Sequence, residues 1–397
     1  MKRSISPFNT HLPNASDLIF CDVTLRDGEV TPGVAFTQAE KVALVKRLDA
    51  IGMQQIQVSF MNDNEAIRQS TMEICSLGLK MKTELMSNGM KPNHLDLVDF
   101  LLECNPDIVH CAFFITKYLN KNWNPSAKDA MKAHMKKAVD YIHSKGKEVN
   151  ISYTDATRAV PEDLLEMVEY AAQVGADRIR LADTTGAVSP EGMYDLVARC
   201  VDKAGKRGTI IGVHCHNDFG LALANTLTSI KAGAKLIDVS VNGLGDRTGN
   251  PATVEMGAAL EILYGDKCGI DLPAMMELSR FTAEISGCEI PVTKPLVGKY
   301  AFSHQQDLHI AEQLREPLAF QCVMAEEFGN KTEIIFGKLS GPCSIQLKAR
   351  EAGVTIEEKY WPAILRILAE DAEKAKGVVL GDADFWKAVE RAKNETA

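Results

Sequence analysis

Three features are missing from this sequence of 397 residues: paired cysteines, long apolar runs and an excess of basic residues. Its ten cysteines include no Cys-x-x-Cys pair, which argues against a zinc ribbon or a disulfide framework and fits reduced thiols in a cytosol. No apolar run approaches the roughly 18 residues of a membrane span, and the polar stretch after Met1-Lys2-Arg3 lacks a signal peptide's apolar core. The net charge of -9 argues against a nucleic-acid-binding surface. We therefore expect a cytoplasmic protein with neither nucleic-acid nor membrane partners.

Strand-like and helix-like runs alternate along most of the chain. The first strand-like run is Leu18–Val23, and a capping box at Thr37–Glu40 opens the helix that follows. Further strand-like runs lie near residues 54–60, 80–87, 107–115, 147–153, 177–182, 209–214 and 236–241. Helix-like runs follow them, for example at 126–145, 161–174 and 190–204. One junction repeats three times, with Gly52, Gly175 or Gly233 ending a helix ahead of the next strand.

Eight such units before about residue 242 predict an α/β protein built on a (β/α)8 TIM barrel. A doubly wound open sheet is the structural alternative, although it does not naturally stop at eight evenly spaced units. The pattern then changes, because prolines and glycines interrupt it after residue 290 and helical patterns return from 355 to 393. We therefore predict a barrel domain over residues 1–270 and a smaller, mostly helical C-terminal subdomain over residues 271–397.

Two histidines stand at the end of the seventh predicted strand. Side chains alternate along a strand, so His214 and His216 point the same way, as half of a metal site would. The pair alone is equally compatible with two core histidines. However, Asp27 follows the first strand and Asn250 follows the eighth, and a closed barrel places strands seven, eight and one side by side. Although Asp and Asn are common in turns, the four together suit a divalent ion such as Mg2+, Mn2+ or Zn2+.

These residues lie within stretches that resemble the signatures of the DRE-TIM metallolyases. This superfamily includes isopropylmalate, homocitrate and citramalate synthases and the hydroxymethylglutaryl-CoA lyases. The three signature stretches are Asp22–Glu29, His214–Ala222 and Asn242–Asn250. The resemblance continues through Lys294–Gly298 and Phe336–Gly341, so it covers roughly residues 18 to 350.

The resemblance implies that a metal ion held by the four residues above chelates a 2-oxo acid through its carboxylate and keto oxygen. Arg26 would add positive charge at that oxygen, and Thr184, Arg158 and His110 match positions of the substrate pocket. In the synthases an acyl-CoA, here expected to be acetyl-CoA, is deprotonated and attacks the ketone. His309 matches a histidine that the C-terminal subdomain lends to catalysis. The alternatives are a salt-bridged arginine at the barrel mouth, a core histidine at 110 and a solvated histidine at 309.

Several positions depart from the synthase pattern. Gln57 stands in the pocket region where glutamate is usual, and Thr154-Asp155 replaces a Glu-Asp pair whose glutamate is implicated in proton chemistry. Asp155 is the nearby candidate for that role, although a regular strand would point it away. The remaining departures are Val30 for a glutamine, Phe320 for a tyrosine and Gln306-Asp307 for a small-Gly pair. Val30 and Gln57 favour a substrate with a less polar side chain and no second carboxylate.

Three functions are compatible with these residues. The favoured one is a metal-dependent acyltransferase that condenses an acyl-CoA with a 2-oxo acid, in accord with the Arg247-containing loop and the added subdomain. A metal-dependent carbon–carbon lyase or aldolase is the alternative, favoured by Thr154 and Phe320. A binding protein without turnover is the third, and retention of Arg26 and His309 speaks against it. Homodimerisation through the subdomain is implied by the resemblance alone.

Overall fold

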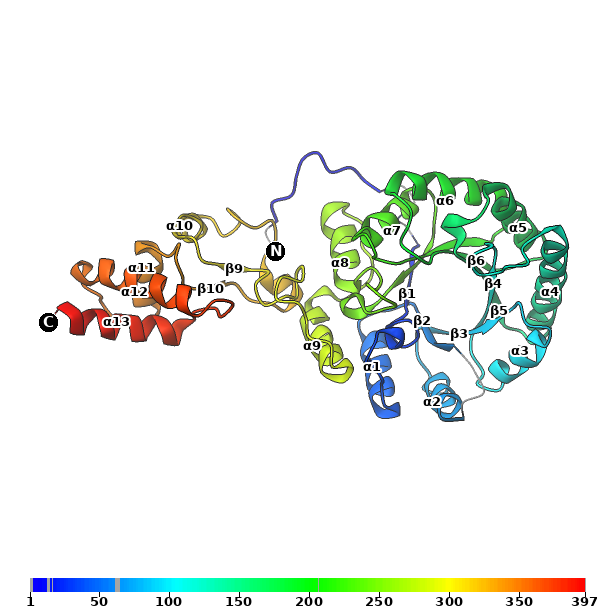
Figure 1. Ribbon diagram of the computed structural model, residues 1–397, viewed down its shortest axis with the longest axis horizontal. Coiled ribbons are helices and arrows are strands. Elements are labelled where there is room, and N and C mark those ends of the chain that lie inside the picture. The colour runs from blue at the N-terminus through cyan, green and yellow to red at the C-terminus, as the bar shows by residue number, and fades with distance from the viewer. Residues whose placement is uncertain (1–2, 13–14, 16, 61–64, 206, 397) are drawn as a thin grey trace. The chain divides into compact units, whose positions relative to one another are not determined.

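The computed structural model describes residues 3–12, 15, 17–60, 65–205 and 207–396. Eight parallel strands close into a barrel in chain order, with β1 paired to both β2 and β8 (Figure 1). The strands are β1 Ile19–Asp22, β2 Gln55–Phe60, β3 Lys82–Asn88, β4 Ile108–Phe114, β5 Glu148–Thr154, β6 Arg178–Asp183, β7 Ile210–Cys215 and β8 Leu236–Val239. Closure confirms the (β/α)8 barrel and excludes the open sheet.

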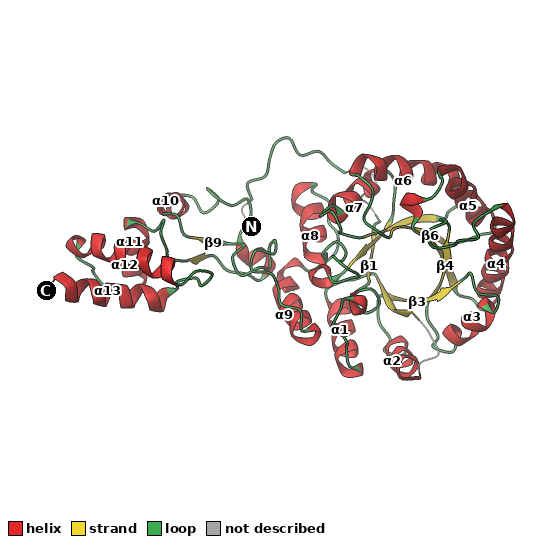
Figure 2. Ribbon diagram, viewed as in Figure 1, coloured by secondary structure: helices red, strands yellow, loops and turns green. Residues whose placement is uncertain are grey.

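Helices surround this barrel, as the ring of red around yellow in Figure 2 shows. They are α1 Gln38–Ala50, α2 Glu65–Cys75, α3 His94–Leu102, α4 Pro125–Ser144, α5 Pro161–Gln173, α6 Pro190–Ala204, α7 Ala222–Lys231 and α8 Thr253–Ala258. The predicted capping box opens α1, since Thr37 accepts from the Glu40 N–H and the Glu40 carboxylate accepts from the Thr37 N–H. The three junction glycines have φ between 90° and 112°, a conformation that favours glycine at helix ends.

The chain divides into two compact units, residues 8–289 and residues 1–7 with 290–397. The division falls one helix later than the boundary expected after residue 270. Helix α9, Met275–Ser286, belongs to the barrel unit because it buries Met275, Met276 and Leu278. The side chain of Asn242 also donates to the Ser279 carbonyl, which ties α9 to the loop after β8.

The C-terminal unit is mostly helical. Its elements are β9 Ser303–His304, α10 Asp307–Arg315, β10 Glu333–Ile334, α11 Pro342–Glu351, α12 Trp361–Lys374 and α13 Asp382–Thr396. Its core gathers apolar residues of the last three helices, among them Ile345, Ile364 and Phe385. Across the described part of the chain, no helix has both the length and the apolar character needed to cross a membrane.

Candidate active site

Three side chains that could hold a metal ion, those of Asp27, His214 and His216, converge at the carboxyl ends of β1 and β7. The Nε2 atoms of His214 and His216 lie 3.1 Å apart. Oδ2 of Asp27 lies 3.9 Å from His214 Nε2 and 4.0 Å from His216 Nε2. All three residues are buried, and one ligand atom from each lies within 4.8 Å of the others. Closure of the barrel places β8 between β7 and β1, so residues far apart in sequence meet here.

Asn250, the fourth predicted ligand, completes this group. Its Nδ2 donates to Asp27 Oδ2 over 2.6 Å and to the Leu244 carbonyl over 3.2 Å. Its Oδ1 is buried and has no hydrogen-bond partner among the described residues. Because buried polar atoms normally have partners, this orphaned oxygen is consistent with a ligand position. The structure thus brings all four predicted side chains together.

The protonation states of the group suit a divalent cation. His214 Nδ1 lies 2.8 Å from Asp238 Oδ2 on β8, so the ring donates there and its Nε2 lone pair faces the group. Burial and the neighbouring His214 lower the pKa of His216 to about 4, which keeps this imidazole neutral. Burial alone would raise the pKa of Asp27, but Arg26, followed by the two histidines, holds it well below its usual value. The neutral imidazole of His216 and the ionised carboxylate of Asp27 are ligand forms that Mg2+, Mn2+ and Zn2+ accept.

A cavity of about 250 Å³ opens beside this group. It is lined by Arg26, Asp27, Val30, Met86, His110, Ser152, Thr154, Arg180, Ala182, Thr184, His214, His216 and Asp246. Arg26 donates through Nη1 to Asp27 Oδ1 over 2.6 Å and through Nε to Gln57 Oε1 over 2.8 Å. The guanidinium is therefore held beside the metal-ligating group by a neighbour on each side.

A buried network of charged and polar side chains fills the barrel beneath the cavity. Arg180 on β6 contacts Glu84 on β3 over 2.5 Å and Asp238 over 3.1 Å. His110 Nδ1 lies 2.6 Å from Glu84 Oε1, and Gln57 Nε2 donates to the same oxygen over 2.9 Å. Burial would raise the pKa of Glu84, but Arg180 and then His110 hold it well below its usual value.

Comparison with known proteins gives this geometry a family. Residues 17–282 match the family described as HMGL-like, and residues 296–376 match the homocitrate synthase post-HMGL domain-like family. The chain belongs to the HMGL-like family. It is 33% identical to homocitrate synthase AksA of Methanocaldococcus jannaschii, over 94% of this chain and 91% of that protein. It is 32% identical to 2-isopropylmalate synthase of Sulfolobus acidocaldarius, over 93% of this chain and 95% of that protein.

A solved structure shares the fold of this HMGL-like chain. Hydroxymethylglutaryl-CoA lyase from Pseudomonas aeruginosa aligns with a TM-score of 0.59 and 20% identity, covering 70% of this chain and 95% of that one. The DRE-TIM resemblance read from the three signature stretches is therefore confirmed at the level of family and fold.

Of the other predicted positions in this HMGL-like barrel, Thr184 lines the cavity but Asp155 and Arg158 do not. Asp155 follows β5 in a left-handed conformation with φ of 66°. Its two carboxylate oxygens accept from Arg158 Nε and Nη2 over 2.7 and 2.9 Å, and from Thr116 over 2.7 Å. Its backbone N–H donates to Thr184 Oγ1. The carboxylate of Asp155 is thus engaged by Arg158 and Thr116, and its role in proton chemistry stays a prediction.

His309 lies on α10 in the C-terminal unit. Its ring stacks on Phe320 with centroids 3.8 Å apart and planes at 21°. His304 lies at 6.4 Å in an edge-on arrangement. The phenylalanine that replaces the family's tyrosine is thus in direct contact with the histidine proposed for catalysis, and its ring has no group to exchange a proton.

Sequence reasoning did not select Glu84, Arg180 or Asp238. Asp238 carried a signal, because it is a charged residue in the otherwise apolar strand β8. Glu84 and Arg180 did not stand out, because β3 and β6 hold other charged residues. Buried charges require partners, and Arg180 pairs with both carboxylates.

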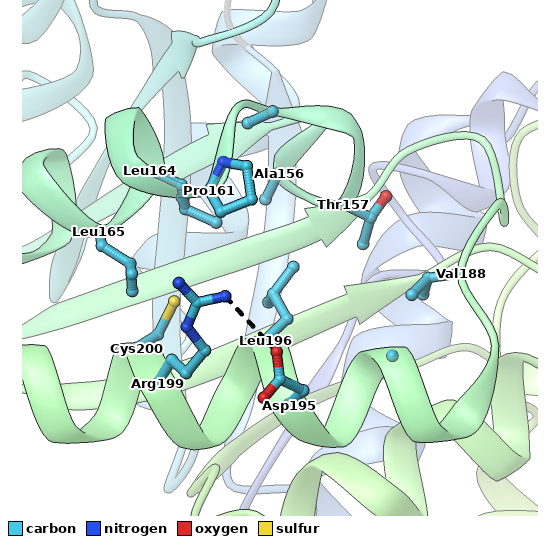
Figure 3. Close-up of a pocket in the computed structure, with 12 residues that line it drawn as sticks. Ala156, Thr157, Pro161, Leu164, Leu165, Val188, Asp195, Leu196, Arg199 and Cys200 are labelled. Carbon is cyan, nitrogen blue, oxygen red and sulfur yellow. Dashed lines mark hydrogen bonds and ion pairs between the residues drawn. The ribbon is translucent and has the colours of Figure 1, made fainter.

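A second cavity of about 230 Å³ lies between α5 and α6 and is shown in Figure 3. Its lining is largely apolar, with Leu164, Leu196 and Val188 among its residues. The charged pair there, Arg199 and Asp195, is 3.5 Å apart. None of the residues that the structure places around this cavity belongs to the metal-ligating group. The chemistry of the molecule therefore centres on the first cavity.

Proposed function

We propose that this protein condenses an acyl-CoA, with acetyl-CoA as the expected donor, with a 2-oxo acid to give a 2-hydroxy acid and CoA. The observation that carries the proposal is the buried group of Asp27, His214 and His216 in one cavity with Arg26. Relatives named homocitrate synthase and 2-isopropylmalate synthase, which share most of their length with this chain, support the same reaction class.

The cavity supplies the groups that would bind and activate the 2-oxo acid. A divalent ion held by Asp27, His214, His216 and Asn250 would act as a Lewis acid on the keto group of the substrate. Arg26 stabilises the negative charge that develops on the keto oxygen when the enolate carbon of the acyl-CoA forms the new carbon–carbon bond. Thr184 holds the substrate carboxylate. Water then hydrolyses the thioester and releases the CoA thiol.

Residues around the cavity act by positioning. His110 on β4 lines the cavity, and Gln57 on β2 orients Arg26 by accepting from its Nε. We assign Asp155 and Arg158 to the support of Thr184, because Asp155 is fixed by Arg158 and binds Thr184 through its N–H. His309 stays the proposed proton carrier from the C-terminal unit. That the protein acts in the cytoplasm and forms a homodimer stays a prediction.

The test is a thiol-release assay with acetyl-CoA, Mn2+ and a panel of 2-oxo acids: pyruvate, 2-oxoisovalerate, oxaloacetate, 2-oxoglutarate and an aromatic oxo acid. Release that depends on one oxo acid and disappears with a chelator supports the condensation. Absence of release with every acid, from protein that binds Mn2+, would contradict it.

A carbon–carbon lyase is the second candidate. It is favoured by Thr154, which lines the cavity where the synthases have a glutamate. Such an enzyme would cleave a 2-hydroxy acid with Mn2+ and no acyl-CoA. Screening the hydroxy acids that correspond to the panel above distinguishes the two reactions.

A further inference from the structure

Each guanidinium that lines the cavity is already paired with a carboxylate. Arg26 Nη1 lies 2.6 Å from Asp27 Oδ1. Arg180 is shared between Glu84 and Asp238, at 2.5 and 3.1 Å. Both arginines are therefore neutralised by the protein before any substrate enters.

The other positive groups near the cavity provide no surplus charge either. His110 lines the cavity, but burial lowers its pKa and keeps the imidazole neutral at pH 7. Arg247 binds Asp218 through Nε over 2.8 Å and also contacts Asp246, so two carboxylates share this guanidinium. Among the described residues that line the cavity there is no lysine.

The charges inside the cavity accept one substrate carboxylate and no more. Arg26 and Arg180 with the carboxylates of Asp27, Glu84 and Asp238 leave one negative charge in excess, and the charge of Asp246, which also lines the cavity, is balanced by Arg247. A divalent ion at the metal-ligating group would turn this into one positive charge. The carboxylate of a 2-oxo acid neutralises that charge. A second carboxylate would then be buried without a partner, which is strongly unfavourable.

Apart from Asp246, which is paired with Arg247, the rest of the cavity wall carries no carboxylate or amine. Met86 on β3 and Ala182 on β6 supply apolar surface, and Ser152 and Thr154 on β5 supply neutral hydroxyls. Val30, which is 51% exposed, closes the wall on the β1 side. This surface suits the side chain of a substrate that carries no charge.

We propose that the substrate is a 2-oxo acid with a single carboxylate and an uncharged, largely apolar side chain. This inference rests on the proposed function and names the substrate class of the same cavity. The selecting feature is the pairing of Arg26 and Arg180 within the protein, which leaves a second carboxylate without a cation.

Two oxo acids of the same shape test the role of charge. In 5-methyl-2-oxohexanoate an isopropyl group replaces the distal carboxylate of 2-oxoglutarate. Binding of each acid to the Mn2+-loaded protein is measured by calorimetry without acyl-CoA, and kcat/KM is measured by thiol release; 2-oxoisovalerate is included as a shorter acid with one carboxylate. We expect one of the two acids with an uncharged side chain to bind at least 100-fold more tightly than 2-oxoglutarate. We expect the values of kcat/KM to rank the acids in the same order as their affinities.

The outcomes separate this inference from the proposed function. Selective binding of an acid with an uncharged side chain, without thiol release, supports the substrate class and contradicts the condensation. If 2-oxoglutarate binds as tightly as both acids with an uncharged side chain, or if none of the three binds to protein that holds Mn2+, the inference is overturned.

A variant at the exposed wall residue separates charge from size. Val30→Arg places an unpaired cation at the cavity, and Val30→Met adds length without charge. The preference is the affinity for 5-methyl-2-oxohexanoate divided by the affinity for 2-oxoglutarate. We expect Val30→Arg to reduce this ratio at least tenfold and Val30→Met to change it less than twofold. An equal shift in both variants would show that size, not charge, selects the substrate and would overturn the inference.

Discussion

The two sides of the cavity are built from different kinds of side chain. The side formed by β7, β8 and β1 carries ionisable groups, namely His214, His216 and Asp27. The wall at β3 and β5 carries neutral residues, among them Met86 and Thr154. The signature stretches that resemble the DRE-TIM metallolyases are intact on the first side, although Val30 just beyond the first stretch departs from the family pattern, and Thr154 departs on the second. Metal-dependent chemistry and the choice of substrate are thus carried by different strands.

Removing a histidine from the metal side should have the largest effect. In His214→Ala the group loses one ligand, and we expect thiol release to fall at least ~1000-fold because Lewis-acid catalysis is lost. Mn2+ titration of the variant should show a matching loss of affinity. His143→Ala, at a half-exposed histidine paired with Asp177, is the control and should keep full activity. Full activity in His214→Ala would refute the assignment of this side to metal chemistry.

Breaking the network that joins the two sides should reduce stability. Arg180→Met leaves Glu84 and Asp238 buried without their cation, and we expect the free energy of unfolding to fall by about 3–5 kcal/mol. Chemical denaturation measures the change. Arg199→Met removes an arginine whose pair with Asp195 is partly exposed and should change stability by less than ~0.5 kcal/mol. Adding Glu84→Gln to Arg180→Met should restore part of the loss, and equal stability of all variants would contradict the network's role.

A smaller effect is expected at the carboxylate behind His214. Asp238→Asn weakens the acceptor of His214 Nδ1, and we expect affinity for Mn2+ to fall about 10–100-fold. Calorimetric titration of Mn2+ measures it. Asp195→Asn, on the exposed face of α6, is the matched control and should bind Mn2+ normally. Unchanged affinity for Mn2+ in Asp238→Asn would show that Asp238 does not support metal binding by His214.

The last prediction concerns the pH dependence of stability. Burial raises the pKa of Asp22 from 3.8 to about 7, although hydrogen bonds from Thr24 oppose the shift. The folded protein therefore binds this proton more tightly than the unfolded chain, so the stabilisation is complete below pH 4 and is lost as the pH rises through 7. Asp22→Asn should make the slope of unfolding free energy against pH less negative by up to about 1.4 kcal/mol per unit between these values. If the slope of unfolding free energy against pH is the same in Asp22→Asn, the raised pKa of Asp22 is contradicted.

The fold was predictable because its signals are local. The eight predicted strands agree with β1 to β8 to within a few residues, since most are apolar runs and all lie between turn or helix signals. The capping box at Thr37 and the helix-ending glycines also depend only on neighbouring residues. The division between the two units was less predictable, because the amphipathic pattern of α9 does not reveal which core it joins.

The site was predictable where strand order alone decides it. Asp27, His214, His216 and Asn250 could be brought together because a closed barrel makes its last and first strands neighbours. The position of Asp155 was not predictable, because it depends on one left-handed residue after β5. The partners of Arg180 were also hidden, since β3, β6 and β8 are not adjacent and only the barrel interior joins them.

The sharing of Arg180 between Glu84 and Asp238 constrains how this enzyme can evolve. A substitution at Glu84 changes the charge that Arg180 presents to Asp238, and Asp238 in turn orients His214. Substitutions at these two acidic positions are therefore epistatic, and neither can be exchanged without disturbing the other. New substrate preferences are reached more readily through Val30, Met86 and Thr154, whose side chains carry no charge and can be replaced one at a time.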